Sequence, residues 1–238
     1  MNIVYCPLVA LGANCELDDN EHHHLQVLRV GVGNAIHIFN GKGYLYQGVV
    51  SSTSKKKTYI QVEQLLRAEA IPTAGLHIAI APTKNIERLE WFIEKATEIG
   101  IQAITPIICQ RSERREVRKD RLEKVVLSAA KQSLHLHLPV VNEAVSFKEF
   151  LKVKTSNPIQ KFIAYCEERT QHLKTLIAST QSIIVLVGPE GDFTIEEVTA
   201  AKESGYMPVG LGESRLRTET AGLMVAAIYQ LASTKKQF

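Results

Sequence analysis

The sequence predicts an α/β protein in which a small β-rich domain precedes a larger domain built on a parallel sheet. Residues 35–65 form short β-type segments separated by glycine and serine turns. From residue 76 onward, apolar strands alternate with helical patterns, which is typical of a parallel sheet with helices on both faces. The pattern changes around Pro72, so we expect domains at residues 1–71 and 72–238.

The β-rich part is expected to begin with a short helix at residues 20–30. Strands at 35–40 and 44–51 flank a G-K-G turn at 41–43, which predicts a hairpin. The alternating segment 58–65 is expected to extend the same sheet.

The second part is expected to alternate between apolar strands and amphipathic helices. Its first helix repeats apolar residues every three or four positions and stops at Gly100. Thr194 and Glu197 have the spacing of a capping box at the start of a later helix. We expect strands at 76–81, 103–109, 161–165, 183–187 and 207–211, and helices at 85–99, 118–134, 194–204 and 218–231.

Four cysteines are present, Cys6, Cys15, Cys109 and Cys166, and none forms a C-x-x-C pair. This spacing suggests no disulfide framework, so we expect free thiols and a cytoplasmic protein. No apolar run reaches the roughly 18 residues that a membrane span needs. The first residues contain no basic leader, so we expect neither a signal peptide nor a membrane partner.

Positive charge is concentrated in one segment rather than spread evenly. The whole chain has a formal net charge of +3. Residues 111–131 contain eight Lys or Arg and four acids, a net charge of +4 (8 − 4). The segment therefore predicts either a surface that contacts nucleic-acid phosphates or a solvated helix face with mixed charges.

Two glycine-containing turns each follow a buried strand and precede a helix. The first is G-P-E-G-D-F at 188–193, and the second runs from Leu211 to the helix that begins near Thr218. Such junctions in an α/β sheet are typical ligand sites, although each is also a plain strand-to-helix turn. Neither matches the dinucleotide or P-loop fingerprint. Arg215 and Arg217 oppose the dipole of the following helix, which indicates an anionic or electron-rich partner.

Five motifs along the chain resemble the RsmE-like family of the SPOUT superfamily. They are H-x-x-x-V-L-R at 23–29, E-K-A-T-E-I-G at 94–100, A-A-K-Q-S at 129–133, V-G-P-E-G at 187–191 and L-G-x-x-x-L-R-T-E-T-A at 211–221. That family methylates N3 of a uridine in 16S ribosomal RNA of the small subunit, with S-adenosylmethionine as methyl donor and no metal.

The resemblance implies a trefoil-knotted catalytic domain, a PUA-like N-terminal barrel that helps to hold RNA, and a homodimer. The knot loops of the family bind S-adenosylmethionine largely through backbone groups. Carried over to this sequence, the cofactor-binding residues would be Tyr165, Cys166, Glu167, Val187, Gly188, Pro189, Glu190, Gly191, Leu211, Gly212, Ser214, Leu216 and Thr218.

RNA-binding and catalytic roles combine the charge pattern with the resemblance. Arg217 is expected to stabilise the uridine anion, Gln132 to orient the base edge, and Glu219 either to accept the proton or to cap its helix. The predicted RNA-binding residues are His23, Arg29, Arg111, Arg114, Arg115, Arg118, Lys131 and His135.

This sequence departs from the family pattern at several positions. Asp192 stands where a second glycine is common, and Glu213-Ser214 stands where Pro-Arg is common. His135 and His137 replace arginines, which predicts weaker or pH-dependent RNA contact there.

Other interpretations remain open at this point. The chain could share the cofactor loops and methylate another RNA, such as a tRNA ribose 2′-hydroxyl, or it could be a non-catalytic factor that binds ribosomal RNA. The run His22-His23-His24 has no partner spacing for zinc and is interpreted as a surface cluster.

Overall fold

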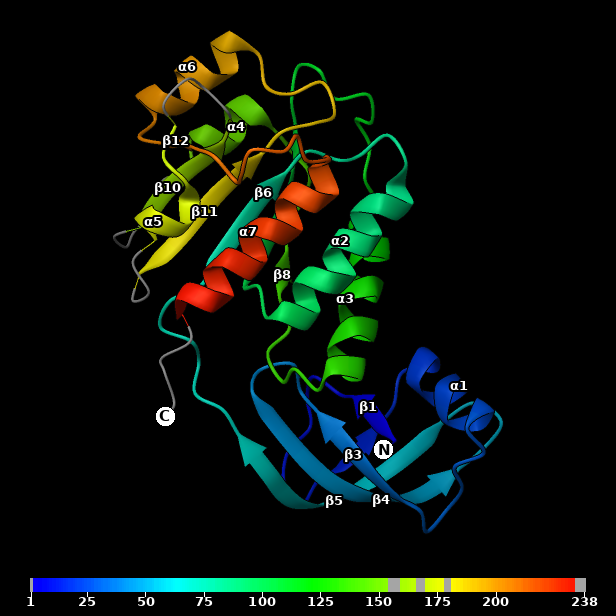
Figure 1. The fold of residues 1–238 in the computed structure, drawn as a ribbon. Helices are drawn as coiled ribbons and strands as arrows, with labels where there is room; N and C mark the ends of the chain where they lie inside the picture. The colour runs from blue at the N-terminus through cyan, green and yellow to red at the C-terminus, as the bar shows by residue number, and fades with distance from the viewer. Residues whose placement is uncertain (1, 154–158, 166–169, 178–180, 234–238) are drawn as a thin grey trace. The chain divides into compact units, whose positions relative to one another are not determined.

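The computed structural model describes residues 2–153, 159–165, 170–177 and 181–233 (Figure 1). The chain divides into two compact units. The first comprises Met1–Ile71 together with Ala130–Leu138, and the second comprises Pro72–Ala129 and Pro139–Phe238.

The first unit is built on a five-stranded sheet in the order β1-β3-β4-β5-β2. Three of its strands were predicted and are confirmed: β3 (Ala35–Phe39), β4 (Tyr44–Thr53) and β5 (Thr58–Ala68). The middle one, β4, pairs antiparallel with both β3 and β5. The edge strands β1 (Ile3–Tyr5) and β2 (Asn14–Glu16) were not predicted, because three residues are too few to show alternation.

The helix of the first unit, α1, spans Asp19–Val27 and is three residues shorter than expected at its C-terminal end. The Asp18 side chain caps its start by accepting a hydrogen bond from the Glu21 N–H. The helix ends because Arg29 has a φ of 56°, a left-handed conformation that no helix continues.

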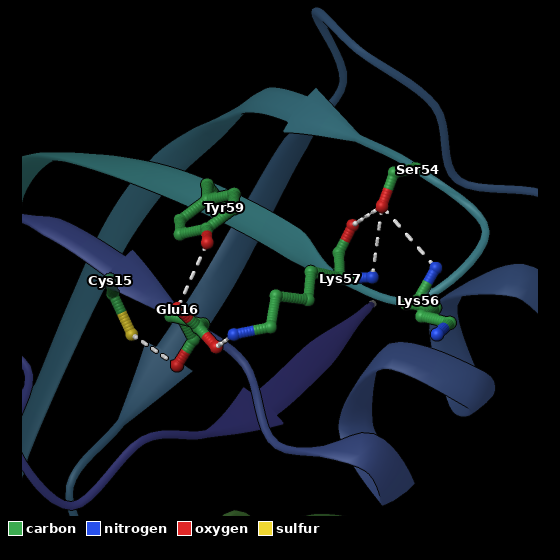
Figure 2. Close-up of polar contacts among 6 residues, drawn as sticks. All are labelled: Cys15, Glu16, Ser54, Lys56, Lys57 and Tyr59. Carbon is green, nitrogen blue, oxygen red and sulfur yellow. Dashed lines mark hydrogen bonds and ion pairs between the residues drawn. The ribbon is translucent and has the colours of Figure 1, made fainter.

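The turn between β4 and β5 carries the basic run at 55–57, and Figure 2 shows how it is held. The Ser54 hydroxyl oxygen accepts hydrogen bonds from the backbone N–H groups of Lys56 and Lys57, at 3.3 and 3.1 Å. The Lys57 ammonium pairs with Glu16, and the Tyr59 hydroxyl donates to the same carboxylate at 2.9 Å. The bond from Lys57 lowers the pKa of Glu16. This turn is therefore fixed to β2.

Cys6 and Cys15 are disulfide-bonded, so the expectation of free thiols is wrong for this pair. The nine-residue separation gave no recognisable spacing, but the pairing of β1 with β3 and of β2 with β5 brings both side chains into the same buried cluster. Cys109 is a free and buried thiol, and burial raises its pKa. Cys166 lies outside the described residues.

The second unit contains the parallel sheet that the sequence predicted, in the order β12-β10-β11-β6-β7-β8, with β9 also pairing with β7. Its strands are β6 (Leu76–Ile80), β7 (Ala103–Ile108), β8 (Val140–Val141), β9 (Val145–Ser146), β10 (Ile159–Ala164), β11 (Ser182–Val187) and β12 (Met207–Val209). The five strands predicted for this unit are confirmed as β6, β7, β10, β11 and β12, and each end lies within two residues of the expected position.

The four predicted helices of this unit are confirmed as α2 (Ile86–Ile99), α3 (Lys119–Ser133), α6 (Ile195–Glu203) and α7 (Thr218–Ser233). Gly100 ends α2 with a φ of 99°, and the predicted capping box starts α6. Two short helices were not predicted, α4 (Phe147–Leu151) and α5 (Leu173–Leu176).

Helices cover both faces of the sheet, as predicted (Figure 1). On one face, α4 and α6 bury a cluster that includes Ala79 of β6, Phe150 and Val198. On the other face, α7 packs against α2 and β6, where a Cβ on Gly222 would lie 3.0 Å from Ile80 Cδ1. No helix in the described parts of the chain is long and apolar enough to cross a membrane.

Candidate functional site

A cavity of about 560 Å³ opens at the carboxyl ends of β10, β11 and β12. Three chain segments line it: the residues after β10, the turn after β11, and the segment that connects β12 to α7. The two glycine-containing turns of the sequence therefore lie side by side. The lining residues are Ala164, Tyr165, Val187, Gly188, Pro189, Glu190, Asp192, Val209, Gly210, Leu211, Gly212, Glu213, Ser214, Arg215, Leu216, Arg217, Thr218 and Ala221.

The turn after β11 is held in a tight conformation by its own backbone. Asp192 has a φ of 64°, and its N–H donates to the Pro189 carbonyl at 2.9 Å. The Asp192 carboxylate accepts a hydrogen bond from the Phe193 N–H at 2.8 Å. Aspartate tolerates left-handed backbone better than most residues, so this departure from the more common glycine keeps the turn.

A second set of hydrogen bonds ties this turn to loops that follow β6 and β7. Arg111 Nη1 donates to the Gly191 carbonyl at 2.9 Å, and the Lys84 N–H donates to Glu190 Oε1 at 3.0 Å. Arg114 Nη2 in turn donates to the Lys84 carbonyl at 2.9 Å. The three loops at this end of the sheet are thus joined to one another by side chains.

The segment between β12 and α7 is tied to the first turn by Thr218. Its hydroxyl donates to the Gly188 carbonyl at 3.0 Å, which closes one side of the cavity. Gly212 has a φ of 136°, so the chain bends there in a way that side chains disfavour. The Tyr165 N–H donates to the Val209 carbonyl at 3.2 Å, which holds the third lining segment.

Most residues predicted to bind the cofactor lie around this cavity. Ten line it: Tyr165, Val187, Gly188, Pro189, Glu190, Leu211, Gly212, Ser214, Leu216 and Thr218. Gly191 belongs to the same turn but is not a lining residue, and Cys166 and Glu167 lie outside the described residues. The other eight lining residues were not predicted to bind the cofactor, although each lies within a few positions of one that was.

The three predicted catalytic residues are in different environments. Arg217 lines the cavity and its side chain is exposed. Glu219 is 7% exposed at the start of α7, with Oε1 3.8 Å from Arg88 Nε, and its Oε2 has no hydrogen-bond partner among the described residues. Gln132 is exposed and belongs to the first unit, whereas the cavity belongs to the second.

Several cations of the predicted RNA surface are engaged within the protein. Arg111 and Arg114 hold loops, as described above, and Arg118 forms an ion pair with Asp120. Lys131 Nζ lies 2.8 Å from Glu21 Oε2, with only 16% of its side chain exposed.

The remaining predicted RNA-binding residues, together with the histidine run, differ in exposure. His23, Arg29 and Arg115 are exposed, and His135 is half-buried. His22 is buried, which contradicts a surface cluster at 22–24, because its ring bonds the Thr58 hydroxyl at 2.8 Å. Nowhere in the described ranges do three or more His, Cys, Asp or Glu side chains gather in a way that could hold a metal ion.

The cavity lining combines polar backbone with charges of both signs. Among the lining residues, Glu190, Asp192 and Glu213 carry carboxylates, while Arg215 and Arg217 carry guanidinium groups. Apolar side chains such as Val187 and Leu216 line the same space. A ligand with a flat apolar ring and charged substituents of both signs fits such a lining.

Comparison with known proteins identifies relatives that match most of the chain. The model of the RNA methyltransferase domain family matches residues 70–230, and the model of the RNA methyltransferase PUA domain matches residues 17–63. The ribosomal RNA small subunit methyltransferase E of Rickettsia conorii is 28% identical over 231 residues, which cover 93% of this chain and 92% of the relative.

Several solved structures match almost the entire fold. A probable rRNA methyltransferase from Porphyromonas gingivalis has a TM-score of 0.86 at 34% identity, covering 98% of both chains. A ribosomal RNA small subunit methyltransferase E from Neisseria gonorrhoeae bound to S-adenosylmethionine has a TM-score of 0.87 at 29% identity, covering 97% of both chains.

Proposed function

This chain belongs to the RNA methyltransferase family, and from that premise we propose that it transfers a methyl group from S-adenosylmethionine to N3 of a uridine in 16S ribosomal RNA of the small subunit. The observation that carries the proposal is the cavity formed jointly by the turns after β11 and β12. Relatives that match more than 90% of this chain carry the name of small-subunit ribosomal RNA methyltransferases, and one of them holds this cofactor.

The cavity fits the cofactor in size and in chemistry. Its volume of about 560 Å³ is within the range of pockets that enclose ligands of this size. An added Cβ on Gly212 would meet no atom within 4 Å, so the backbone there is open to a ligand. Glu190, Asp192 and Glu213 suit the cationic groups of the cofactor, and the backbone of 210–212 suits its adenine ring. When bound, S-adenosylmethionine supplies an electrophilic methyl group on a cationic sulfur.

The protein's task at the substrate is to favour loss of the N3 proton and to hold the anion. A uridine that loses this proton spreads negative charge onto its two flanking carbonyl oxygens. Arg217 is an exposed residue of the cavity lining, and its guanidinium stabilises that charge in the proposed mechanism. The reacting edge takes part in base pairing, so the uridine must be unpaired or flipped out.

Glu219 is best assigned to positioning rather than to proton transfer. Its carboxylate is buried at the N-terminal turn of α7, where the helix dipole favours negative charge. The neighbouring Arg88 provides a cation at 3.8 Å. In this role Glu219 fixes the start of α7, and therefore the Thr218 hydroxyl that closes the cavity.

From the family resemblance we also propose a trefoil knot, a homodimer and a cytoplasmic location. The knot and the dimer are proposed from the resemblance alone. In the proposed dimer, Gln132 orients the base edge. We assign residues 1–71, with which residues 130–138 cluster, to a PUA-like RNA-binding barrel, and the rest of residues 72–238 to the catalytic domain.

Two measurements test the function. Isothermal titration calorimetry is expected to show saturable binding of S-adenosylmethionine, and no binding would favour a non-catalytic factor. Mass mapping of ribosomal RNA from a strain that lacks the protein is expected to show one unmodified uridine in 16S RNA. Persistence of that methylation, with a loss in tRNA instead, would overturn the choice of substrate.

Substitution Arg217→Ala tests the assigned role within the mechanism. We expect cofactor binding and the melting temperature to stay near wild type while turnover falls by about 100-fold or more. Arg217→Lys is expected to recover part of the rate, because it restores charge without the planar donor fork. Near-normal turnover of Arg217→Ala would remove this residue from the mechanism.

A further inference from the structure

A second hollow in the described part of the chain lies next to the cofactor cavity and is not part of it. Lys84, Glu113, Arg114, Arg115 and Glu116 line this open groove, which has a volume of about 510 Å³. The loops after β6 and β7 form its walls. It adjoins the cavity directly, because the Lys84 N–H donates to Glu190, a residue of the cavity lining.

Within the groove, the three cations differ in what they already bind. Arg114 is half-buried and donates to the carbonyls of Thr83 and Lys84, so its donors are directed inward. Lys84 forms an ion pair with Glu113 at 2.8 Å, although both side chains are more than half exposed. Arg115 is exposed and makes no hydrogen bond or ion pair with another residue that the structure describes.

The loop that presents Arg115 is fixed at several points. Arg111 and Arg114 donate to carbonyl groups of neighbouring loops. The Ser112 hydroxyl accepts a hydrogen bond from the Cys109 N–H at 3.0 Å. The Arg115 guanidinium is therefore displayed from an ordered backbone, and its five donors are available to a ligand.

We propose that this groove binds a backbone phosphate of the RNA strand, next to the nucleotide that enters the cofactor cavity, with Arg115 as the main contact. This inference rests on the proposed function. An arginine fork matches the geometry of a phosphate, and a contact to the backbone fixes the position of a strand without reading its sequence. The exposed Lys84–Glu113 pair is weak, so the Lys84 ammonium can turn to the same phosphate.

Arg115→Ala tests the groove, with Lys124→Ala as the matched control. Lys124 is an exposed cation of the same segment that does not line the groove, so both variants lose one positive charge. Fluorescence anisotropy with a short uridine-containing RNA, at several salt concentrations, gives the affinity and its salt dependence. We expect Arg115→Ala to bind about tenfold more weakly, with a salt slope smaller by about 0.7 to 1. Lys124→Ala should stay within about twofold of wild type.

A second variant acts in the opposite direction. Glu113→Gln removes the carboxylate that holds Lys84, so we expect tighter RNA binding than wild type and a steeper salt slope. Titration of wild type with inorganic phosphate alone should give no measurable heat, because the groove needs the rest of the strand.

The outcomes separate the groove from the proposed function. S-adenosylmethionine binding should be unchanged in all three variants. If wild type binds the cofactor and methylates RNA while Arg115→Ala binds RNA as tightly as Lys124→Ala, the groove proposal is overturned and the function stands. If inorganic phosphate saturates the groove without displacing RNA, the site is one for a small anion and the proposal fails. If wild type binds no cofactor, the function itself fails.

Discussion

A neutral histidine lies within the parallel sheet of the second unit. His77 Nε2 is 2.7 Å from the Thr105 hydroxyl, which also accepts a hydrogen bond from Asn142 Nδ2 at 2.8 Å. The ring of Phe150 packs edge-on against the imidazole, at 5.5 Å between ring centres. Burial disfavours the charged imidazolium and lowers the pKa of His77 to about 4.

This pKa predicts a loss of stability in acid. Above the unfolded-state pKa of about 6.5, His77 is neutral in both states and has no effect. As pH falls below that value, only the unfolded chain takes up the proton. The free energy of unfolding therefore decreases until about pH 4, where the folded protein is protonated as well. Urea unfolding of wild type and His77→Gln at pH 7.5, 5.5 and 4.5 measures this cost. Between pH 7.5 and 4.5, we expect the free energy of unfolding of wild type to fall by up to roughly 3 kcal/mol more than that of the variant. Parallel pH profiles of the two proteins would refute the assignment.

The charge pattern of the sequence did not show which groups the Lys and Arg side chains of residues 111–131 bind. The net charge of residues 111–131 predicted a phosphate-binding surface, but Arg111 and Lys131 are engaged with a carbonyl and a carboxylate from distant parts of the chain. These partners are 80 and 110 residues away, so no local pattern indicates them. The glycine turns were predictable as ligand sites because each follows an apolar strand that was itself recognisable.

At the scale of elements, one side chain from the loop after β7 helps to hold the turn after β11. Arg111 Nη1 donates to the Gly191 carbonyl, and an added Cβ on Gly191 would lie 3.2 Å from Arg111 Cβ. The guanidinium thus holds a turn that lines the cavity without entering the cavity itself. Arg111→Ala should free this turn.

We expect Arg111→Ala to weaken S-adenosylmethionine binding by about three- to tenfold, measured by calorimetry, because the turn must then be ordered on binding. Arg111→Lys should restore part of the affinity, since one ammonium donor can still reach one carbonyl. A variant that binds the cofactor like wild type would show that the rest of the turn is sufficient.

The packing of α7 on α2 depends on a glycine. A Cβ on Gly222 would lie 2.7 Å from Phe92 Cε2 and 3.0 Å from Ile80 Cδ1. Alanine normally favours a helix by about 1 kcal/mol over glycine, but here the added methyl group overlaps the buried Phe92 ring and crowds Ile80. We expect Gly222→Ala to destabilise by about 1–3 kcal/mol in urea unfolding, and Gly222→Val by more. Stabilisation by alanine would contradict the close approach of these helices.

Element length decided which parts of the fold were predictable. Strands such as β6 and helices such as α2 contain several periods of the apolar pattern, and they lie where the sequence placed them. The two-residue strands β8 and β9 and the five-residue α4 contain less than one clear period. Their residues pair with or pack on β7, so tertiary contacts rather than local pattern create them.

At the scale of the molecule, the chain returns to the first unit after it has left it. Residues Ala130–Leu138 cluster with Met1–Ile71, so α3 begins in the second unit and ends in the first. The Gly43 N–H donates to the Leu136 carbonyl at 2.9 Å, and the Leu138 N–H donates to the Gly41 carbonyl at 3.0 Å. No periodicity signals such a return, because the backbone groups involved have no side-chain signature.

An ion pair between Lys131 and Glu21 also joins this returning segment to α1. Glu21 is 3% exposed, and Lys131 Nζ lies within 2.9 Å of both its carboxylate oxygens. Removing only the lysine would leave a buried carboxylate without its cation, whereas removing both charges leaves no such deficit.

A double-mutant cycle tests whether this pair fastens residues 130–138 to the first unit. We expect Lys131→Met alone to destabilise by about 3–5 kcal/mol and the double variant with Glu21→Gln by much less, because the isolated buried charge is what is costly. Hydrogen exchange of the Gly43 and Leu138 amides, whose bonds join residues 130–138 to the turn at 41–43, should accelerate in Lys131→Met and recover in the double variant. Additive effects of the two substitutions, with unchanged exchange at both amides, would mean that this ion pair does not hold the returning segment.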